Sequence, residues 1–176
     1  MLFTETKLKG AFLLELEKRE DRRGFFARTF CQREFAAHGM NPDVVQCNIA
    51  YNKKKATLRG MHFQNAPFQE AKFIRCTKGA IYDVILDLRP GSPTFKQWIS
   101  AELSEDNHKM LYVPEGFAHG YQTLTEVSEI IYQVSQSYAP ESAGGVRYDD
   151  PAFSIKWPLE VAVISDLDTS WPDFKG

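Results

Sequence analysis

Short runs of alternating apolar and polar residues, separated by glycine and proline turns, recur along the chain from about residue 44 onward. The clearest runs are residues 82–88 and 129–134, and the Pro-Gly-Ser-Pro sequence at 90–93 is typical of a turn. Many short strands with little helix favour a closed or sandwiched antiparallel β domain, since closure leaves few strand edges unpaired. The pattern therefore predicts a mainly β fold with a few short helices.

Three further segments complete the expected secondary structure. Residues 1–20 predict two short strands that lead into a charged turn. Residues 31–38 predict a helix that turns Phe35 and Ala36 inward. Residues 161–165 predict a last strand. We expect the 176 residues to form one domain, because a chain of this length can bury a sizeable core.

Charge and cysteine usage exclude several classes of partner and site. The chain has 21 Lys and Arg against 23 Asp and Glu, so nothing in its charge indicates a nucleic-acid partner. The first residues lack the apolar run of a signal peptide, and no stretch approaches the length of a membrane span. We therefore expect a cytoplasmic protein with no membrane partner. The three cysteines follow no C-x-x-C spacing, which argues against a disulfide framework or a zinc knuckle.

The segment Thr57–Gln64 carries an unusual concentration of polar side chains, among them Arg59, His62 and Gln64. On a strand, His62 and Gln64 point to the same face, so that face must border either solvent or a polar pocket. Lys72 follows ten residues after His62. A histidine and a lysine that face one cavity would supply a proton-transfer group and a positive charge for an oxyanion. For either residue alone, a partly buried histidine or a solvated lysine is the simpler interpretation.

Three other polar residues in apolar surroundings are candidates for the same site. His119 lies between Gly116 and Gly120, where the backbone can approach a ligand closely, although a simple turn histidine fits equally well. Asp83 sits in an apolar strand and needs a partner, since carboxylates are rarely buried alone. Tyr132 shares a strand face with apolar residues, which is typical of a core tyrosine and less often of a catalytic phenol.

The remaining candidates have a plain interpretation and a functional one. Gln46 and Asn48 share a strand face as solvated residues or as hydrogen-bonding groups of a pocket. Arg23 and Phe26 belong either to a solvated hairpin tip or to an anion-binding arginine beside stacking rings. Asp168 by itself is typical of a helix cap or loop. The four histidines include no H-x-H pair, the spacing that places two imidazoles on one strand face, so we predict no metal site.

Seven motifs follow one another along nearly the whole chain: Asp-Arg-Arg-Gly-Phe-Phe at 21–26, Leu-Arg-Gly-Met-His-Phe-Gln at 58–64, Asp-Val-Ile-Leu-Asp-Leu-Arg at 83–89, Gly-Ser-Pro-Thr-Phe at 91–95, Val-Pro-Glu-Gly-Phe-Ala-His-Gly at 113–120, Asp-Asp-Pro at 149–151 and Ile-Lys-Trp-Pro at 155–158. Together they resemble the dTDP-4-dehydrorhamnose 3,5-epimerase family of the deoxysugar pathways. The resemblance implies a cupin-like jelly roll, a homodimer, and catalysis with neither metal nor organic cofactor. It also implies a nucleoside-diphosphate 4-keto-6-deoxy sugar as substrate, inverted at C3, C5 or both.

The resemblance also implies a role for each matching residue. His62 resembles the general base, and Asp168 resembles the acid that orients its imidazole. Lys72 is similar to the residue that stabilises the enolate oxygen, and Tyr132 to the phenol that returns a proton on the opposite face. The positions that resemble substrate-binding residues are Arg23, Gln46, Asn48, Arg59 and His119, with Phe26, Arg28 and Tyr138 as neighbouring candidates.

The chain departs from the family pattern at two points, which leave the nucleotide and the sugar open. Arg28 stands where the family carries Glu, and Ser137-Tyr138 stands where Tyr-Tyr is common. Two alternatives share the expected scaffold, because β barrels of this kind host many functions. One is a nucleotide-sugar 3,4-ketoisomerase. The other is a non-catalytic sugar-binding module, which would be favoured if the expected catalytic side chains did not converge on one cavity.

Overall fold

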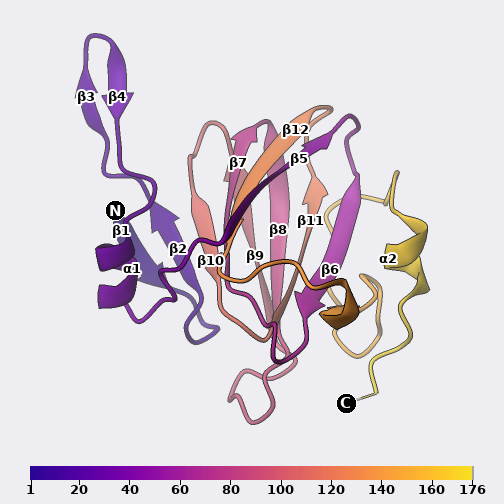
Figure 1. Cartoon of the computed structure of the whole chain (residues 1–176). Helices are drawn as coiled ribbons and strands as arrows, with labels where there is room; N and C mark the ends of the chain where they lie inside the picture. Colours follow the sequence, from indigo (N-terminus) through magenta and orange to yellow (C-terminus); the bar gives the residue numbers. More distant parts are fainter. Residues whose placement is uncertain (176) are drawn as a thin grey trace.

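The computed structural model describes residues 1–175 and is built almost entirely of antiparallel strands. The strands form a six-stranded sheet and a five-stranded sheet that face each other, together with a separate two-stranded hairpin (Figure 1). The expectation of a mainly β fold with a few short helices is therefore confirmed. No helix within these residues is long and apolar enough to cross a membrane.

The sheets and helices have the following bounds. The six-stranded sheet contains, in spatial order, β1 (Leu2–Glu5), β2 (Phe12–Glu15), β10 (Met110–Val113), β7 (Lys72–Lys78), β12 (Ser128–Val134) and β5 (Gln46–Asn52). The five-stranded sheet contains β13 (Ala143–Gly145), β6 (Leu58–Gln64), β11 (Phe117–Thr123), β8 (Ala80–Asp87) and β9 (Trp98–Ser104). The hairpin consists of β3 (Arg19–Asp21) and β4 (Gly24–Phe26), and the helices are α1 (Gln32–Ala37), the 3-10 helix η1 (Pro140–Ser142) and α2 (Asp166–Ser170).

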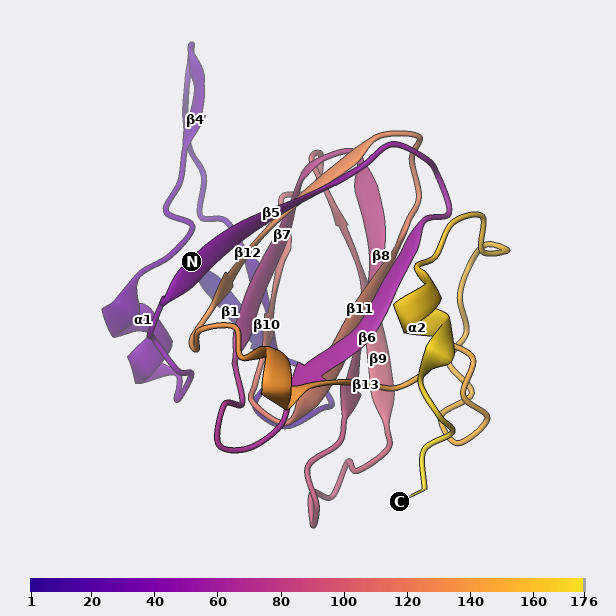
Figure 2. The same cartoon turned by 45° about the vertical axis from the view of Figure 1, so that its right-hand side comes forward.

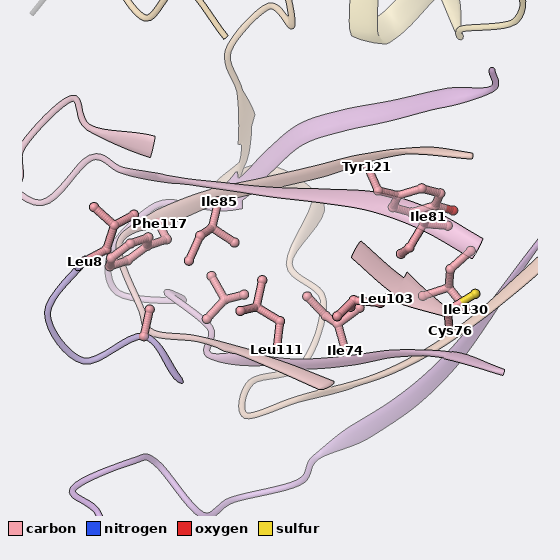
Figure 3. Close-up of a cluster of buried hydrophobic side chains, with 12 residues drawn as sticks. Leu8, Ile74, Cys76, Ile81, Ile85, Leu103, Leu111, Phe117, Tyr121 and Ile130 are labelled. Carbon is pink, nitrogen blue, oxygen red and sulfur yellow. The ribbon is translucent and has the colours of Figure 1, made fainter. Parts of the chain in front are cut away.

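A cluster of buried apolar side chains fills the space between the two main sheets (Figure 3). Ile74 and Leu111 enter it from the six-stranded sheet, whereas Ile85 and Phe117 enter it from the five-stranded sheet. Each of these four side chains is almost completely removed from solvent. Burial of this kind stabilises the fold by roughly 1.5–3 kcal/mol for each large apolar side chain. The packed cluster holds the two sheets at a fixed separation.

Strand β8 is buried on both faces, which explains its strongly apolar sequence. Ile85 belongs to the cluster between the sheets, while Val84 and Leu86 belong to a second cluster that the C-terminal part of the chain covers. The predicted alternation of this strand is therefore confirmed. Asp83 and Asp87 are also fully buried. Asp83 has the partner that the sequence predicted, in the form of a histidine, and Asp87 is paired with an arginine.

Two local expectations were wrong. Helix α1 buries Phe35 but leaves Ala36 exposed, because a helix of six residues turns only a narrow face toward the strands. Residues 161–165 form no strand; Val163 makes one isolated bridge with Thr57. The chain cannot continue alongside β6 because it enters helix α2 immediately afterwards, where Ser165 caps the helix.

Strands β6 and β11 come unusually close at two facing glycines. Gly60 has a φ of +111°, and a Cβ placed on it would lie 2.6 Å from the Cα of Gly120. A Cβ on Gly120 would lie 2.7 Å from the carbonyl oxygen of Arg59. Only residues without a side chain fit such an approach. The contact fixes the relative position of the two strands where His62 and His119 stand opposite each other.

Candidate active site

The imidazole of His62 on β6 meets the carboxylate of Asp168 on α2. The distance between His62 Nε2 and Asp168 Oδ1 is 2.5 Å, although the two residues are 106 positions apart in the sequence. The backbone N–H of Gly60 donates to the other carboxylate oxygen at 3.2 Å. The Asp168 side chain is 4% exposed and that of His62 is 43% exposed. The buried carboxylate thus holds the ring while the rest of the imidazole faces open space.

The protonation state of Asp168 follows from these contacts. Burial raises the pKa of the carboxyl group, but hydrogen bonds from His62 and Gly60 lower it by more, so the net pKa lies below its usual value. Asp168 is therefore a carboxylate at neutral pH. A carboxylate in contact with one ring nitrogen orients the imidazole and stabilises the imidazolium that forms when the other nitrogen accepts a proton.

His62, Lys72 and Tyr132 line one cavity between the two sheets. Its larger part has a volume of about 400 Å³. An adjoining hollow of about 160 Å³ shares the same three residues. The larger part is lined by Gln46, Asn48, His62, Phe63, Gln64, Glu70, Lys72, Tyr132, Val134, Tyr138, Ala143, Gly144, Leu167 and Trp171, and the smaller by Ala50, Arg59, His62, Lys72, His119, Tyr121 and Tyr132.

Strand register explains why these side chains meet. In the six-stranded sheet, Lys72 pairs with Val134, and Val134 pairs with Gln46. Tyr132 lies two residues before Val134 on β12 and pairs with Asn48. Paired residues, and residues two apart on one strand, share a face, so Lys72, Gln46, Tyr132 and Asn48 all project from the same face of the sheet. His62 comes from the facing sheet, where it pairs with His119 (Figure 2 shows β6 and β11 opposite β5, β7 and β12). The cavity therefore has polar groups on both walls.

The phenol of Tyr132 is half-buried in this cavity. Burial raises the pKa of Tyr132, and the negative charge of Glu70 raises it further, while the positive charge of Arg59 acts in the opposite direction. The net pKa is higher than usual, so the phenol is protonated at neutral pH. A protonated phenol on the wall opposite an imidazole can give a proton to a group held between them.

A second histidine–carboxylate pair lies behind the smaller hollow. His119 Nε2 is 2.7 Å from Asp83 Oδ1, and both side chains are buried. The other carboxylate oxygen of Asp83 has no hydrogen-bond partner among residues 1–175. Arg59 donates through its Nε to the side chain of Asn52 at 2.8 Å. These contacts fix the orientation of His119 and Arg59 at the cavity wall.

Three predicted binding residues lie away from the cavity of their own chain. Arg23 and Phe26 sit on the hairpin β3–β4, which projects from the body of the molecule (Figure 1). Phe26 is 70% exposed, and Arg23 contacts the carboxylate of Asp21. Arg28 forms an ion pair of 2.7 Å with Glu34 beside a separate hollow of about 320 Å³. A single chain therefore does not bring these three residues to His62.

Tyr138 lines the cavity as predicted from the family resemblance, and so do Glu70, Leu167 and Trp171, which the sequence analysis did not predict. Tyr138 is an exposed rim residue whose backbone N–H donates to the Gln46 side chain at 2.5 Å. Glu70 lies two residues before Lys72, a spacing that could have indicated a shared face. Leu167 and Trp171 flank Asp168 on and after the short helix α2, where no periodic pattern pointed to them. Within residues 1–175, no group of three or more His, Cys, Asp or Glu side chains is arranged to hold a metal ion.

Comparison with known proteins decides the family. The sequence model described as dTDP-4-dehydrorhamnose 3,5-epimerase matches residues 5–176. A relative of that name from Sinorhizobium fredii is 40% identical, over 98% of this chain and 89% of its own length. The chain belongs to the dTDP-4-dehydrorhamnose 3,5-epimerase family. The resemblance seen in the sequence is thus confirmed, and with it the class of isomerase.

Solved structures of the family superpose closely on this fold. The dTDP-4-dehydrorhamnose 3,5-epimerase from Bacillus anthracis, with TDP and PPi bound, has a TM-score of 0.94 and 40% identity, covering 98% of this chain and 99% of its own. The dTDP-6-deoxy-D-glucose-3,5-epimerase from Legionella pneumophila, in complex with dTDP-4-keto-L-rhamnose, has a TM-score of 0.87 and 34% identity, covering 95% and 89%. The cupin-like jelly-roll class expected from the sequence is therefore confirmed.

Proposed function

We propose that this chain epimerises a nucleoside-diphosphate 4-keto-6-deoxy sugar at C3, C5 or both, using its own side chains and neither a metal nor an organic cofactor. The convergence of His62, Lys72 and Tyr132 on one cavity is the observation that carries the proposal. The ligands of the Bacillus and Legionella structures support a thymidine-linked 4-keto sugar as the substrate class. The same convergence counts against a non-catalytic binding module.

The first chemical step is removal of a proton next to the C4 ketone. Such a proton is weakly acidic, and its loss builds negative charge on the ketone oxygen. His62 is the base, since a neutral imidazole nitrogen can accept a proton, and Asp168 stabilises the imidazolium that results. Lys72 is the cation that stabilises the enolate oxygen, because its charge is in place before the proton leaves.

The second step returns a proton from the other side of the ring. His62 belongs to the five-stranded sheet and Tyr132 to the six-stranded sheet, so the base and the acid face the cavity from opposite walls. A sugar ring between the walls would lose a proton to His62 and receive one from Tyr132 on its opposite face. Because the proton leaves from one face of the ring and a proton returns to the opposite face, the configuration at that carbon is inverted.

Solvent deuterium uptake tests this function. A panel of 4-keto-6-deoxy sugars linked to different nucleoside diphosphates is incubated in deuterated buffer, and uptake at C3 and C5 is measured by NMR. We expect uptake at one or both carbons together with an inverted product. A product whose carbonyl has moved to C3 would identify a ketoisomerase, and no uptake with any substrate would refute the proposal.

We also propose that the chain acts as a homodimer in which each hairpin β3–β4 completes the cavity of the partner. The second strand of the hairpin carries exposed aromatic rings, with Phe25 43% and Phe26 70% exposed. Strand β5 is the edge of the six-stranded sheet beside the cavity, and its Ile49 and Tyr51 are 62% and 48% exposed. An apolar edge strand of this kind is a site for pairing with another chain. A second copy would therefore cover the edge and bring Arg23 and Phe26 to the substrate.

A mixing experiment tests this arrangement. His62→Ala removes the base, and Phe26→Ala removes a ring of the hairpin, so each variant alone should be impaired. If the hairpin acts on the partner, a heterodimer has one site with both changes and one site with neither. Equal amounts of the two variants, unfolded and refolded together, should then recover about a quarter of wild-type activity for a twofold-symmetric dimer. No recovery, or a monomer by light scattering, would contradict the proposal.

A further inference from the structure

The cavity contains a carboxylate that the proposed reaction does not use. Glu70 Oε1 is 3.1 Å from the ammonium of Lys72, and the two side chains are only 11% and 10% exposed. Glu70 Oε2 is 3.5 Å from the amide nitrogen of Gln64. Both oxygens are therefore engaged by side chains that line the cavity. A negative charge here would repel a diphosphate sugar, so its presence calls for a function that outweighs the repulsion.

The backbone around Glu70 is held in place. Ala71, which lies between Glu70 and Lys72, forms two hydrogen bonds with Ser135. The Ala71 N–H donates to the Ser135 hydroxyl at 2.8 Å, and the Ala71 carbonyl accepts from the Ser135 N–H at 3.0 Å. Gln64 also donates to the carbonyl oxygens of Phe68 and Ser137. The segment that carries Glu70 is thus tied to the end of β12. Its carboxylate is presented to Lys72 at a fixed position.

We propose that Glu70 is a positioning residue, which fixes the Lys72 ammonium at the place where the enolate oxygen develops. This inference rests on the proposed function. A lysine side chain has four rotatable carbon–carbon bonds, and holding it in one arrangement has an entropic cost. One N–H of the ammonium donates to Glu70, which leaves the other two to point toward the substrate. A cation oriented before the reaction stabilises developing charge without further rearrangement.

The charge of Glu70 has a second effect, on the acid of the reaction. After burial, it is the largest contribution that raises the pKa of Tyr132, and Arg59 acts against it. Besides Glu70 and Arg59, the titratable groups that share the two hollows with Tyr132 are His62, Lys72, His119, Tyr121 and Tyr138. Neutralising Glu70 should therefore lower the pKa of Tyr132 and bring the alkaline limb of the pH profile to lower pH.

The test compares Glu70→Gln, Glu70→Asp and wild type. Glu70→Gln keeps the shape and one acceptor oxygen but removes the charge. We expect its kcat to fall roughly ten- to hundredfold, as for other losses of positioning near the reacting atoms. KM should stay the same or decrease, because a charge that repels the diphosphate is gone. The alkaline limb should move to lower pH, and Glu70→Asp should return the limb to its wild-type position.

A matched control is Glu129→Gln on the same strand as Tyr132. The Glu129 carboxylate accepts a hydrogen bond from Thr77 at 2.9 Å and lies outside the cavity, so kcat and the pH profile should not change. A Glu70→Gln enzyme with wild-type kcat and an unmoved limb would overturn the inference, as would a raised KM with kcat unchanged. Wild-type protein that exchanges no proton in any substrate would instead refute the proposed function, and this inference with it.

Discussion

Replacing Asp168 by Asn should show how much the reaction depends on the carboxylate that orients the base, because His62 itself is kept. The substitution keeps the size of the side chain and one acceptor oxygen but removes the charge that faces His62. Two unit charges roughly 4 Å apart attract by about 4 kcal/mol at an effective dielectric of about 20. Because His62 is 43% exposed, solvent screening reduces this value, and we take about 2–3 kcal/mol. We therefore expect kcat to fall roughly 30- to 150-fold.

The assay for this variant measures deuterium uptake at C3 and C5 and, separately, binding of the nucleoside diphosphate. Uptake should fall at both carbons, since one base precedes both inversions, while nucleotide binding stays within about threefold. Asp166→Asn is the matched control, because Asp166 lies in the same helix and is exposed. An Asp168→Asn enzyme whose kcat stays within about threefold of wild type would refute the proposed role of the carboxylate in orienting His62.

Three further predictions concern the acid, the nucleotide and the fold. Tyr132→Phe should retain proton exchange while inversion falls, because His62 can still remove and return a proton on its own face; equal loss of both processes in NMR time courses would contradict this. If the proposed homodimer brings Arg28, which follows the hairpin, to the nucleotide of the partner, Arg28→Glu should change the ranking of kcat/KM among thymidine-, cytidine-, guanosine- and uridine-linked substrates, since arginine only donates hydrogen bonds; an unchanged ranking would make Arg28 a surface ion-pair residue. Burial raises the pKa of Asp87, but Arg89 and two hydroxyl groups lower it to about 2, so its stabilisation is complete above the unfolded pKa of 3.8 and is lost as pH falls toward 2. Asp87→Asn should therefore lower the free energy of unfolding by about 2 kcal/mol at neutral pH, and urea titrations should show this difference shrinking below about pH 4.

Strand alternation was the strongest signal in the sequence, because burial on one face dictates a period of two. It predicted both faces of β8 and the common face of Gln46 and Asn48. It failed at residues 161–165, where a run of apolar residues leads into a helix cap instead of pairing along a sheet. Patterns of this kind report local burial and cannot tell which distant segment supplies the neighbour.

The candidate site shows the same limit. His62 and Lys72 stood out because polar side chains in an apolar strand need a pocket. Asp168 entered through family resemblance alone, since a carboxylate in a short C-terminal helix has no local signal for its contact with β6. Glu70 has little local signal of its own, because a glutamate in a loop is usually solvated. Phe26 lies on hairpin β3–β4 and does not line the cavity, and no pattern in the sequence encodes how that hairpin projects.

The close contact of Gly60 with Gly120 has a consequence for changing this enzyme. A side chain at either position would meet backbone atoms at 2.6–2.7 Å, so the strands that carry His62 and His119 cannot be shifted by small substitutions. New substrate shapes must come from the rim of the cavity. A library that varies the rim residues while both glycines are kept would sample new sugars without moving the proton-transfer groups; the positions to vary are Tyr138, Leu167 and Trp171.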